Sequence, residues 1–261
     1  MTTEILLSCM HQQDASIVAD CRVPTNVVVV NQCDREETRE ETFRDGTCRM
    51  VFISTTERGL SRSRNKAIEN ATADLCMLAD DDEIFCDDFV EKLTTAFKEH
   101  PQADVITFKV DGTESSKKAF AQTECRIGYV KAMQLCSVMI AFRRESVVKK
   151  NIRFDVEMGS GTGHGTCEEV RFLFDCLKNG LQIQHVPVTV ARLQEDSASQ
   201  WFKGYNERFF WERGWATERL MGRPLAVLYS FYYVLTKRKM YRDSISAKSA
   251  LWQTLKGIFH R

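Results

Sequence analysis

A run of four consecutive valines, Val27–Val30, constrains the fold of this chain more than any other feature. Valine is β-branched and favours strands, and polar residues, Asn26 and Asn31, bound the run on either side. An uninterrupted apolar strand of this kind is buried on both faces, which is typical of the interior of a parallel sheet. The chain is therefore expected to build a sheet that is covered on both sides.

Apolar segments with strand and helix patterns alternate around this run. The expected strands are at residues 4–9, 26–31, 51–53, 75–79, 105–110, 138–142 and 183–190, and the expected helices are at 15–20, 65–73, 89–100 and before Asn179-Gly180. Pro187 interrupts the last strand and favours an edge position for it. The alternation predicts an α/β fold with a doubly wound, mostly parallel central sheet flanked by helices. Such sheets bind ligands beyond the carboxyl ends of their strands.

Two charged segments follow one another at the length of one helix. The first, Arg58–Asn65, is basic and contains a glycine, and the second, Asp80–Glu83, directly follows the apolar strand at 75–79. Carboxylates this close repel one another unless a cation or hydrogen-bond donors hold them. Mg²⁺ takes one or two carboxylates together with substrate phosphates, and guanidinium groups bind phosphate bidentately. The two segments together indicate a nucleotide-diphosphate site, whereas an acidic run alone is also typical of a solvated turn.

The motif order resembles that of the inverting family 2 glycosyltransferases of the bacterial surface-polysaccharide type, which have the GT-A fold. Arg58-Gly-Leu-Ser-x-Ser-Arg-Asn65, the helix ending Ala-Thr-Ala-Asp74 and the strand ending Leu78-Ala-Asp-Asp-Asp82 carry the resemblance, which covers about the first 200 residues. It implies that Asp80 and Asp82 form the Asp-x-Asp motif at the metal, which would be Mg²⁺ or Mn²⁺. Asp82 would coordinate the ion, and Asp80 would also lie near the ribose or the sugar.

The same resemblance implies further residues that bind the nucleotide-sugar donor. The expected donor contacts are Asp34, Arg58, Arg64, Asn65, Asp80 and Asp81. Asp34 would contact the uracil or ribose, although a turn aspartate is an equal alternative from the residues alone. The chain departs from the family at Glu83, where many members have an aspartate.

An acidic pair, Glu168-Glu169, stands at the start of the expected helix that ends near Asn179. Inverting transfer needs a carboxylate that takes the proton of the acceptor hydroxyl. The resemblance implies that Glu169 is this base, in a position where aspartate is more common in the family, and that Glu168 orients the base or the acceptor. Acidic residues at a helix start also stabilise the helix dipole, which is the structural alternative.

A glycine-rich segment, Gly159–Gly165, precedes this acidic pair. It lacks the Gly-Lys-Ser/Thr ending of a phosphate-binding P-loop. Two interpretations stay open: a loop that approaches the sugar or the acceptor closely, and a loop with a structural role only.

The charge is unevenly distributed along the chain. The chain has 36 basic and 36 acidic residues, which gives no argument for nucleic acid as a partner. Residues 200–261 contain 12 Lys/Arg and 4 Asp/Glu, so this segment has a net charge of 12 − 4 = +8. We therefore divide the chain into a GT-A nucleotide-sugar-binding and catalytic domain at 1–200 and a basic, aromatic, helical extension at 201–261.

The extension contains two features that suit an interface. Its aromatic residues are Trp201, Tyr205, Phe209, Phe210, Trp211 and Trp215. Aromatics at this spacing stack on sugar rings or, more commonly, form a core or an interface. An apolar segment at 225–235, too short to span a membrane, precedes Lys237-Arg238-Lys239. This pattern suits a helix on an anionic membrane surface or a packed helix with a solvated end.

The ten cysteines are scattered, without a Cys-x-x-Cys pair, and indicate reduced cytosolic thiols. The start of the chain, Met1-Thr-Thr-Glu, has no signal-peptide pattern. We expect a cytoplasmic protein that is peripheral at the inner face of the cell membrane.

These observations favour a metal-dependent, inverting glycosyltransferase. It would move a sugar from a nucleotide donor, with UDP favoured, to a hydroxyl of a glycan or lipid-linked oligosaccharide in surface-polysaccharide biosynthesis. Two alternatives stay open: an inactive sugar-nucleotide-binding or scaffold subunit, and a nucleotidyltransferase. The latter more typically has a glycine-rich basic loop after its first strand, where this chain has Ser8-Cys-Met-His-Gln12.

Overall fold

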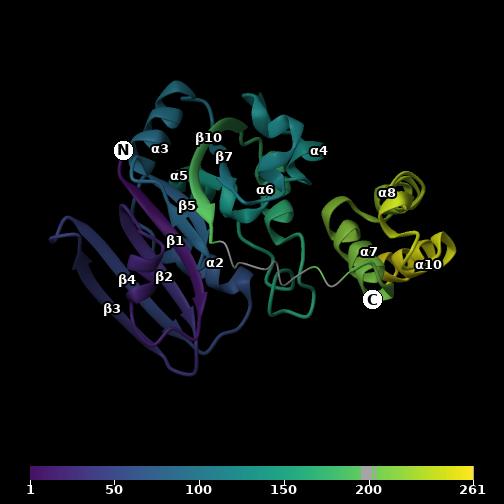
Figure 1. Cartoon of the computed structure of the whole chain (residues 1–261), viewed down its shortest axis with the longest axis horizontal. Helices are drawn as coiled ribbons and strands as arrows, with labels where there is room; N and C mark the ends of the chain where they lie inside the picture. Colours follow the sequence, from purple (N-terminus) through teal and green to yellow (C-terminus); the bar gives the residue numbers. More distant parts are fainter. Residues whose placement is uncertain (195–201, 203, 261) are drawn as a thin grey trace.

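The computed structural model describes residues 1–194, 202 and 204–260. Figure 1 shows an α/β body followed by a group of C-terminal helices. This arrangement has the α/β class and the helical C-terminal extension that the sequence predicts. The domain boundary at 200/201 and Trp201 of the aromatic series lie outside the described residues.

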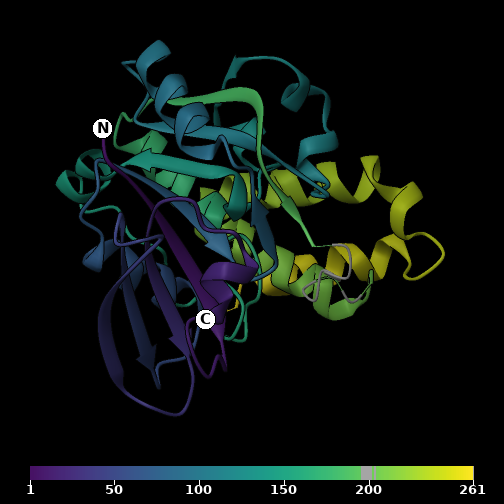
Figure 2. The same cartoon turned by 60° about the vertical axis from the view of Figure 1, so that its left-hand side comes forward.

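The first half of the sheet is parallel and contains the valine run. Its strands are β1 (Thr3–Met10), β2 (Asn26–Gln32), β4 (Cys48–Thr55) and β5 (Leu75–Asp80), in the order β4-β2-β1-β5. All four valines of β2 are buried, as predicted. The parallel strands β1, β2 and β4 run toward the same edge (Figure 2). Since β2 and β5 lie on opposite sides of β1, the strand order reverses there, which is where doubly wound sheets bind ligands.

Two helices connect these parallel strands. Helix α1 (Ser16–Asp20) joins β1 to β2, and α2 (Leu60–Asn70) joins β4 to β5 and packs on β1 and β2. The helix predicted at 65–73 therefore begins five residues earlier and ends at Asn70. Gly59, with φ +117°, begins α2, and the extended backbone of Ala71 ends it. The motif Arg58–Asn65 thus lies mostly in a helix.

The sheet is mixed beyond β5, so the expectation of a mostly parallel sheet holds for its first half only. The further strands are β9 (Ile140–Arg143), β7 (Val105–Asp111), β10 (Ile183–Leu193), β6 (Glu83–Phe85) and β8 (Cys125–Arg126). Strand β9 is antiparallel to both β5 and β7, whereas β10 is parallel to β7. The polar strand β3 (Glu37–Phe43), antiparallel to β4, forms the opposite edge and has no apolar pattern that would have predicted it.

The edge position predicted for the strand with Pro187 is wrong. β10 pairs with β7 on one side and with β8 and β6 on the other. Pro187 lies within an irregularity of the β7 pairing, between His185 and Thr189. Proline has no N–H to donate to a neighbouring strand. At a bulge the hydrogen bonds between the strands are already interrupted, so an interior strand can accommodate the proline.

The remaining helices cover the body or connect its strands. They are α3 (Phe89–Glu99), α4 (Tyr129–Ala132), α5 (Arg144–Lys149) and α6 (Glu168–Lys178), together with the short 3₁₀ segments η1 (Ser115–Lys117), η2 (Ala119–Gln122) and η3 (Ser137–Met139). Helix α3 packs on β10, and α6 leads back to it.

The C-terminal helices have an apolar core of their own. They are α7 (Glu207–Met221), α8 (Arg223–Thr236), α9 (Arg238–Tyr241) and α10 (Ala247–Ile258). Phe210 of the aromatic series is central to this core together with Tyr233 and Tyr241. Tyr205 and Phe209 pack against it, so these three members of the series serve packing. Helices α7 and α10 cross closely: a Cβ at Gly214 or Gly257 would lie 2.0 Å from a carbonyl oxygen of the other helix. No helix in the described part of the chain is both long and apolar enough to span a bilayer.

Candidate active site

Two buried amides fix the loops at the carboxyl edge of the parallel strands. The Asn31 side chain accepts a hydrogen bond from the Gln12 N–H (2.9 Å) and donates one to the Gln12 carbonyl (2.8 Å). The Gln32 side chain accepts one from the Gly59 N–H (2.7 Å), just before α2. His11, directly after β1, has a left-handed backbone with φ 56°. The side chains at the end of β2 thus fix the paths of the loops that follow β1 and β4.

Arg58 and Asp34 meet at this edge. One terminal nitrogen of Arg58 contacts Asp34 Oδ1 at 2.5 Å, and the other donates to the carbonyls of Cys33 (2.9 Å) and Thr56 (2.8 Å). The Asp34 side chain is 90% exposed. The structure therefore brings together two of the predicted donor contacts and leaves the carboxylate accessible to a ligand.

Arg64 is a buried cation that joins three elements. Its guanidinium donates to Asp80 at the end of β5 (3.0 Å), to Glu168 at the start of α6 (3.0 Å) and to Ser137 in η3 (2.7 Å). Burial opposes the charge, but the carboxylates of Asp80, Glu168 and Glu169 outweigh it and raise the pKa of Arg64. A buried charge is costly unless it is paired and hydrogen-bonded, and here two carboxylates compensate it.

The face of α2 that carries Arg64 also holds the chain that leads to α6. Residues three and four apart lie on one side of a helix. Ser61 donates to the Met158 carbonyl (2.7 Å), and Asn65 exchanges two hydrogen bonds with the Phe154 backbone (2.8 and 2.9 Å). The segment is therefore attached to α2 at Phe154, at Met158 and, through Arg64, at Glu168.

The glycine-rich segment packs against the start of α2. Gly161 has φ +85°, and a Cβ there would lie 3.2 Å from Gly59 Cα. Gly159 has φ +99°, and a Cβ there would lie 3.2 Å from both Glu168 Cγ and Ser61 Oγ. These glycines allow a close backbone approach beside the acidic pair. Of the two interpretations left open by the sequence, the packing supports a structural role at these two positions.

The four acidic residues Asp80–Glu83, which begin with the last residue of β5, have different environments. Glu83 is fully buried in β6, and its carboxylate accepts a hydrogen bond from the Asp80 N–H (2.8 Å). Burial, with the charge of Asp80, raises the pKa of Glu83 well above its ordinary value. Asp81 and Asp82 are half-buried, and burial also raises the pKa of Asp81. Glu83 therefore stabilises the turn, while the three aspartates remain at the sheet edge.

The carboxylates at this edge fit a metal that is shared with a substrate. No group of three or more histidine, cysteine, aspartate or glutamate side chains within residues 1–194, 202 and 204–260 could hold an ion by itself. Asp80 and Asp82 are both half-buried and offer one or two carboxylates. This donor set suits Mg²⁺ or Mn²⁺, which completes its shell with phosphate oxygens and water rather than with a protein cage.

The acidic pair begins α6 after a left-handed residue, Cys167, with φ 68°. Glu168 is buried against Arg64, whereas Glu169 is half-buried. Burial and the neighbouring charge of Glu168 raise the pKa of Glu169 to about 8. A carboxylate with a pKa near neutral is suited to take a proton during a reaction.

Comparison with known proteins identifies the class of this chain. A family model described as glycosyl transferase family 2 matches residues 4–157, which is more than half of the chain. No curated protein matches the chain.

Solved structures of low sequence identity share the fold. A fragment of S. aureus TarS, residues 1–349 in complex with UDP-GlcNAc, is similar with a TM-score of 0.67 at 13% identity, over 99% of this chain and 82% of that one. The same fragment with UDP gives 0.65 at 14% identity, over 99% and 81%. The mannosyltransferase PcManGT from Pyrobaculum calidifontis, in complex with GDP-Man and Mn²⁺, gives 0.54 at 12% identity, over 98% and 73%. The GT-A fold expected from the sequence is confirmed.

Replacement of Arg64 by methionine tests the buried ion cluster. Arg64→Met leaves the Asp80 and Glu168 carboxylates without their cation, and a broken buried pair costs about 3–5 kcal/mol of unfolding free energy. Adding Glu168→Gln removes one of the stranded charges and should recover part of that loss. Urea unfolding followed by circular dichroism measures both. Arg126, exposed on β8, provides the control Arg126→Met, with an expected change within about 0.5 kcal/mol. A loss at Arg64 no larger than that of the control would contradict the assignment.

Proposed function

This chain belongs to glycosyl transferase family 2, and we propose that it is a metal-dependent, inverting enzyme that uses a nucleotide-sugar donor. The observation that carries the proposal is the contact of Arg64 with both Asp80 and Glu168. This contact joins the predicted metal-binding and donor-binding strand to the start of α6, where the predicted base Glu169 directly follows Glu168. The residues proposed to bind the donor and the residue proposed as the base thus lie on two elements, β5 and α6, that Arg64 links.

A UDP-linked sugar is the proposed donor. The structures similar in fold bind UDP-GlcNAc or UDP in one protein and GDP-Man in another, so the fold alone admits either nucleotide. Asp34, held beside Arg58 and exposed, is proposed to contact the uracil or ribose. Asp80 and Asp81 are proposed to lie near the ribose and the sugar.

Arg64 and Asn65 have their polar groups engaged within the protein. We therefore propose that both residues act by positioning the strand and loop that surround the donor. Their direct contact with the donor stays a prediction from the family resemblance.

In the proposed reaction Glu169 removes the proton of the acceptor hydroxyl as its oxygen attacks the anomeric carbon. The bond from that carbon to the nucleoside diphosphate breaks, and attack from the opposite face inverts the configuration. A metal bound by Asp82 and Asp80 would neutralise the leaving diphosphate. Glu168, fixed by Arg64, holds the start of α6 and keeps negative charge next to Glu169, which favours its uptake of a proton.

The two alternatives left open by the sequence fare differently. Family membership sets aside the nucleotidyltransferase. The inactive-subunit alternative requires that the intact carboxylates, Asp82 and Glu169, contribute nothing to transfer, which the experiments below decide.

The C-terminal helices carry a surface that suits an anionic membrane. One face of α8 exposes large apolar side chains, including Leu228 (66%) and Leu235 (72%), with Leu225, Phe231 and Tyr232. The cationic residues Lys237–Lys239 follow at its end. Apolar insertion combined with a basic cluster binds anionic bilayers. We propose a peripheral enzyme at the cytoplasmic membrane face that acts on a lipid-linked or growing surface glycan.

Calorimetric titration with UDP and with GDP tests the donor site. With Mn²⁺ present UDP should bind more tightly than GDP, and EDTA should weaken binding at least tenfold. Asp82→Asn should have the same effect as EDTA, because it removes the proposed metal ligand. Asp243→Asn, at a side chain 88% exposed, is the matched control and should bind as the native chain does. If neither EDTA nor Asp82→Asn weakens UDP binding, the metal assignment is overturned.

The pH dependence of turnover tests the base. Glu169 acts only when deprotonated, and its pKa is raised to about 8, so turnover of the donor should rise with pH up to that value and then level off. Glu169→Gln should lower turnover by about 10²–10⁴-fold, with donor affinity retained. The exposed Glu145 of α5 provides the control Glu145→Gln. An unchanged rate in Glu169→Gln would support the inactive-subunit alternative or a different base.

Vesicle sedimentation tests the membrane surface. The native chain should sediment with vesicles that contain phosphatidylglycerol and remain free with phosphatidylcholine alone. The double variant Leu228→Glu/Leu235→Glu should lose this binding, because it places charges on the apolar face of α8. Val130 is 76% exposed on α4, and Val130→Glu is the control. Equal sedimentation of both variants would exclude α8 as the contact.

A further inference from the structure

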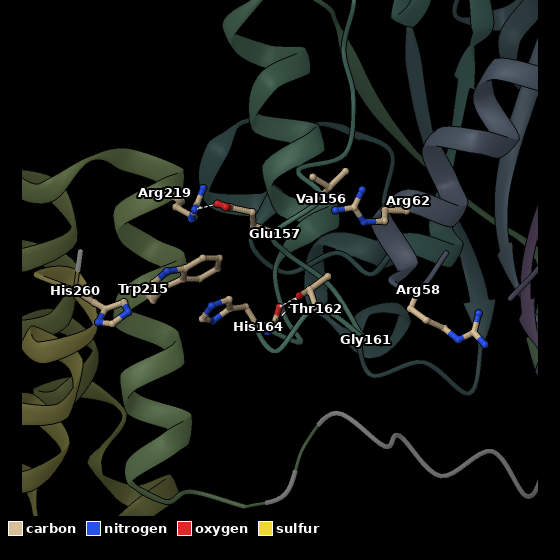
Figure 3. Close-up of a pocket in the computed structure, with 10 residues that line it drawn as sticks. All are labelled: Arg58, Arg62, Val156, Glu157, Gly161, Thr162, His164, Trp215, Arg219 and His260. Atoms are coloured by element: carbon tan, nitrogen blue, oxygen red, sulfur yellow. Dashed lines mark hydrogen bonds and ion pairs between the residues drawn. The ribbon is translucent and has the colours of Figure 1, made fainter. Parts of the chain in front are cut away.

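A cavity of about 500 Å³ lies between the body and the C-terminal helices (Figure 3). On the body side it is lined by Arg58, by Arg62 of α2 and by the glycine-rich segment, which includes Gly161 and His164. Trp215 and Arg219 of α7, together with His260, line the other side. Both parts of the chain are therefore needed to form it.

This cavity adjoins both halves of the proposed active site. Arg58 lines it and also contacts Asp34, the proposed nucleoside ligand. Gly161 and His164 also line it, and Gly159 of the same glycine-rich segment packs against Glu168, the neighbour of the proposed base. The cavity thus lies between Arg58 and the segment that leads to the acidic pair, a place from which the reactive hydroxyl of an acceptor could extend toward Glu169.

Most of the lining lies outside the part of the chain that matches the family. The match ends at residue 157, whereas Gly161, His164, Trp215 and His260 follow it. Arg58 and Arg62 lie within the matched part, so the cavity combines residues of the basic donor motif with residues beyond the family model.

One wall of the cavity is rigidly built. Arg219 pairs with Asp155 (3.2 Å) and with Glu157, and it lies over the Trp215 ring at 4.4 Å. The His164 ring stacks on the same tryptophan at 3.7 Å, with the two planes 10° apart. These contacts hold the loop against α7 and neutralise Arg219 within the protein.

Arg62 is the arginine of this cavity that is available to bind a ligand. Its side chain is exposed, and it makes no hydrogen bond or ion pair with any residue that the structure describes. Arg58 and Arg219 already have carboxylate partners, and Glu157 is the acidic residue of the lining. Asp155 is a second carboxylate on Arg219, so Arg62 is the arginine of this lining without a carboxylate partner among the described residues, and it can form a bidentate contact to an anionic group.

We propose that this cavity binds the acceptor and that the acceptor is an anionic glycan or polyol, with a phosphate or carboxylate group on Arg62. The inference rests on the proposed transferase function and adds the chemical class of the second substrate. A neutral oligosaccharide would leave the Arg62 guanidinium without an anionic partner.

Titration with three probes, in the presence of saturating UDP and Mn²⁺, tests the proposal. The probes are a glycerol-phosphate oligomer, an oligogalacturonate and neutral maltohexaose. At least one of the two anionic probes should bind, and which one binds identifies phosphate or carboxylate as the group on Arg62. Maltohexaose should not bind. Arg62→Gln should weaken the anionic probe at least tenfold, and Arg62→Glu should abolish its binding.

The control separates this cavity from general attraction to the basic extension. Arg242, with a side chain 62% exposed, provides Arg242→Gln, which should bind the anionic probe as the native chain does. Equal loss in Arg62→Gln and Arg242→Gln would overturn the proposal, as would a probe that binds without UDP but not at saturating UDP, which would place Arg62 in the donor site. If UDP binds with Mn²⁺ but neither anionic probe does, the acceptor class is wrong and the transferase function stands. If UDP and GDP both fail to bind, the proposed function itself fails.

Discussion

The buried ion cluster of Arg64, Asp80 and Glu168 is the interaction on which the rest of the site depends. Arg64 is 1% exposed, so its charge is stable only because carboxylates from two other elements reach it. Those elements are β5, in the parallel half of the sheet, and α6, which leads into β10 of the mixed half. One guanidinium therefore fixes the distance between the two halves of the proposed active site. Movement of either carboxylate would leave the buried charge of Arg64 without one of its partners.

The segment between Phe154 and Glu168 is held from two sides. Helix α2 binds it through Ser61, Arg64 and Asn65, and α7 binds it through Arg219 and the stacked ring of Trp215. This segment has few apolar residues and no regular structure until α6 begins, so these polar and aromatic contacts determine its path. The C-terminal helices are thus part of the support of the site rather than an independent appendage.

Patterns of apolar residues predicted the parallel strands and their carboxyl edge, because buried strands require such patterns. The valine run became β2, and Asp34, Arg58 and Asp80 lie where the strand ends placed them. Contacts between distant residues were not predictable: nothing in the sequence marks Ser137 or Phe154 as partners of α2. The burial of Glu83 was not predicted either, because the acidic run itself does not show which carboxylate turns inward. Pro187 suggested an edge strand because the irregularity that accommodates it has no pattern in the sequence. The cavity beside Arg62 depends on the packing of α7 against the body, and no sequence pattern indicates that packing.

The most direct test of this account is a crystal structure of the chain with UDP and Mn²⁺, in which anomalous scattering locates the manganese. The account predicts one manganese site on the Asp82 carboxylate, bridged to the UDP diphosphate at the carboxyl edge of β1 and β5. Asp80 should still be paired with Arg64, and the uridine should lie beside Asp34. Manganese bound away from Asp82, or UDP bound in the cavity beside Arg62 and Trp215, would contradict it.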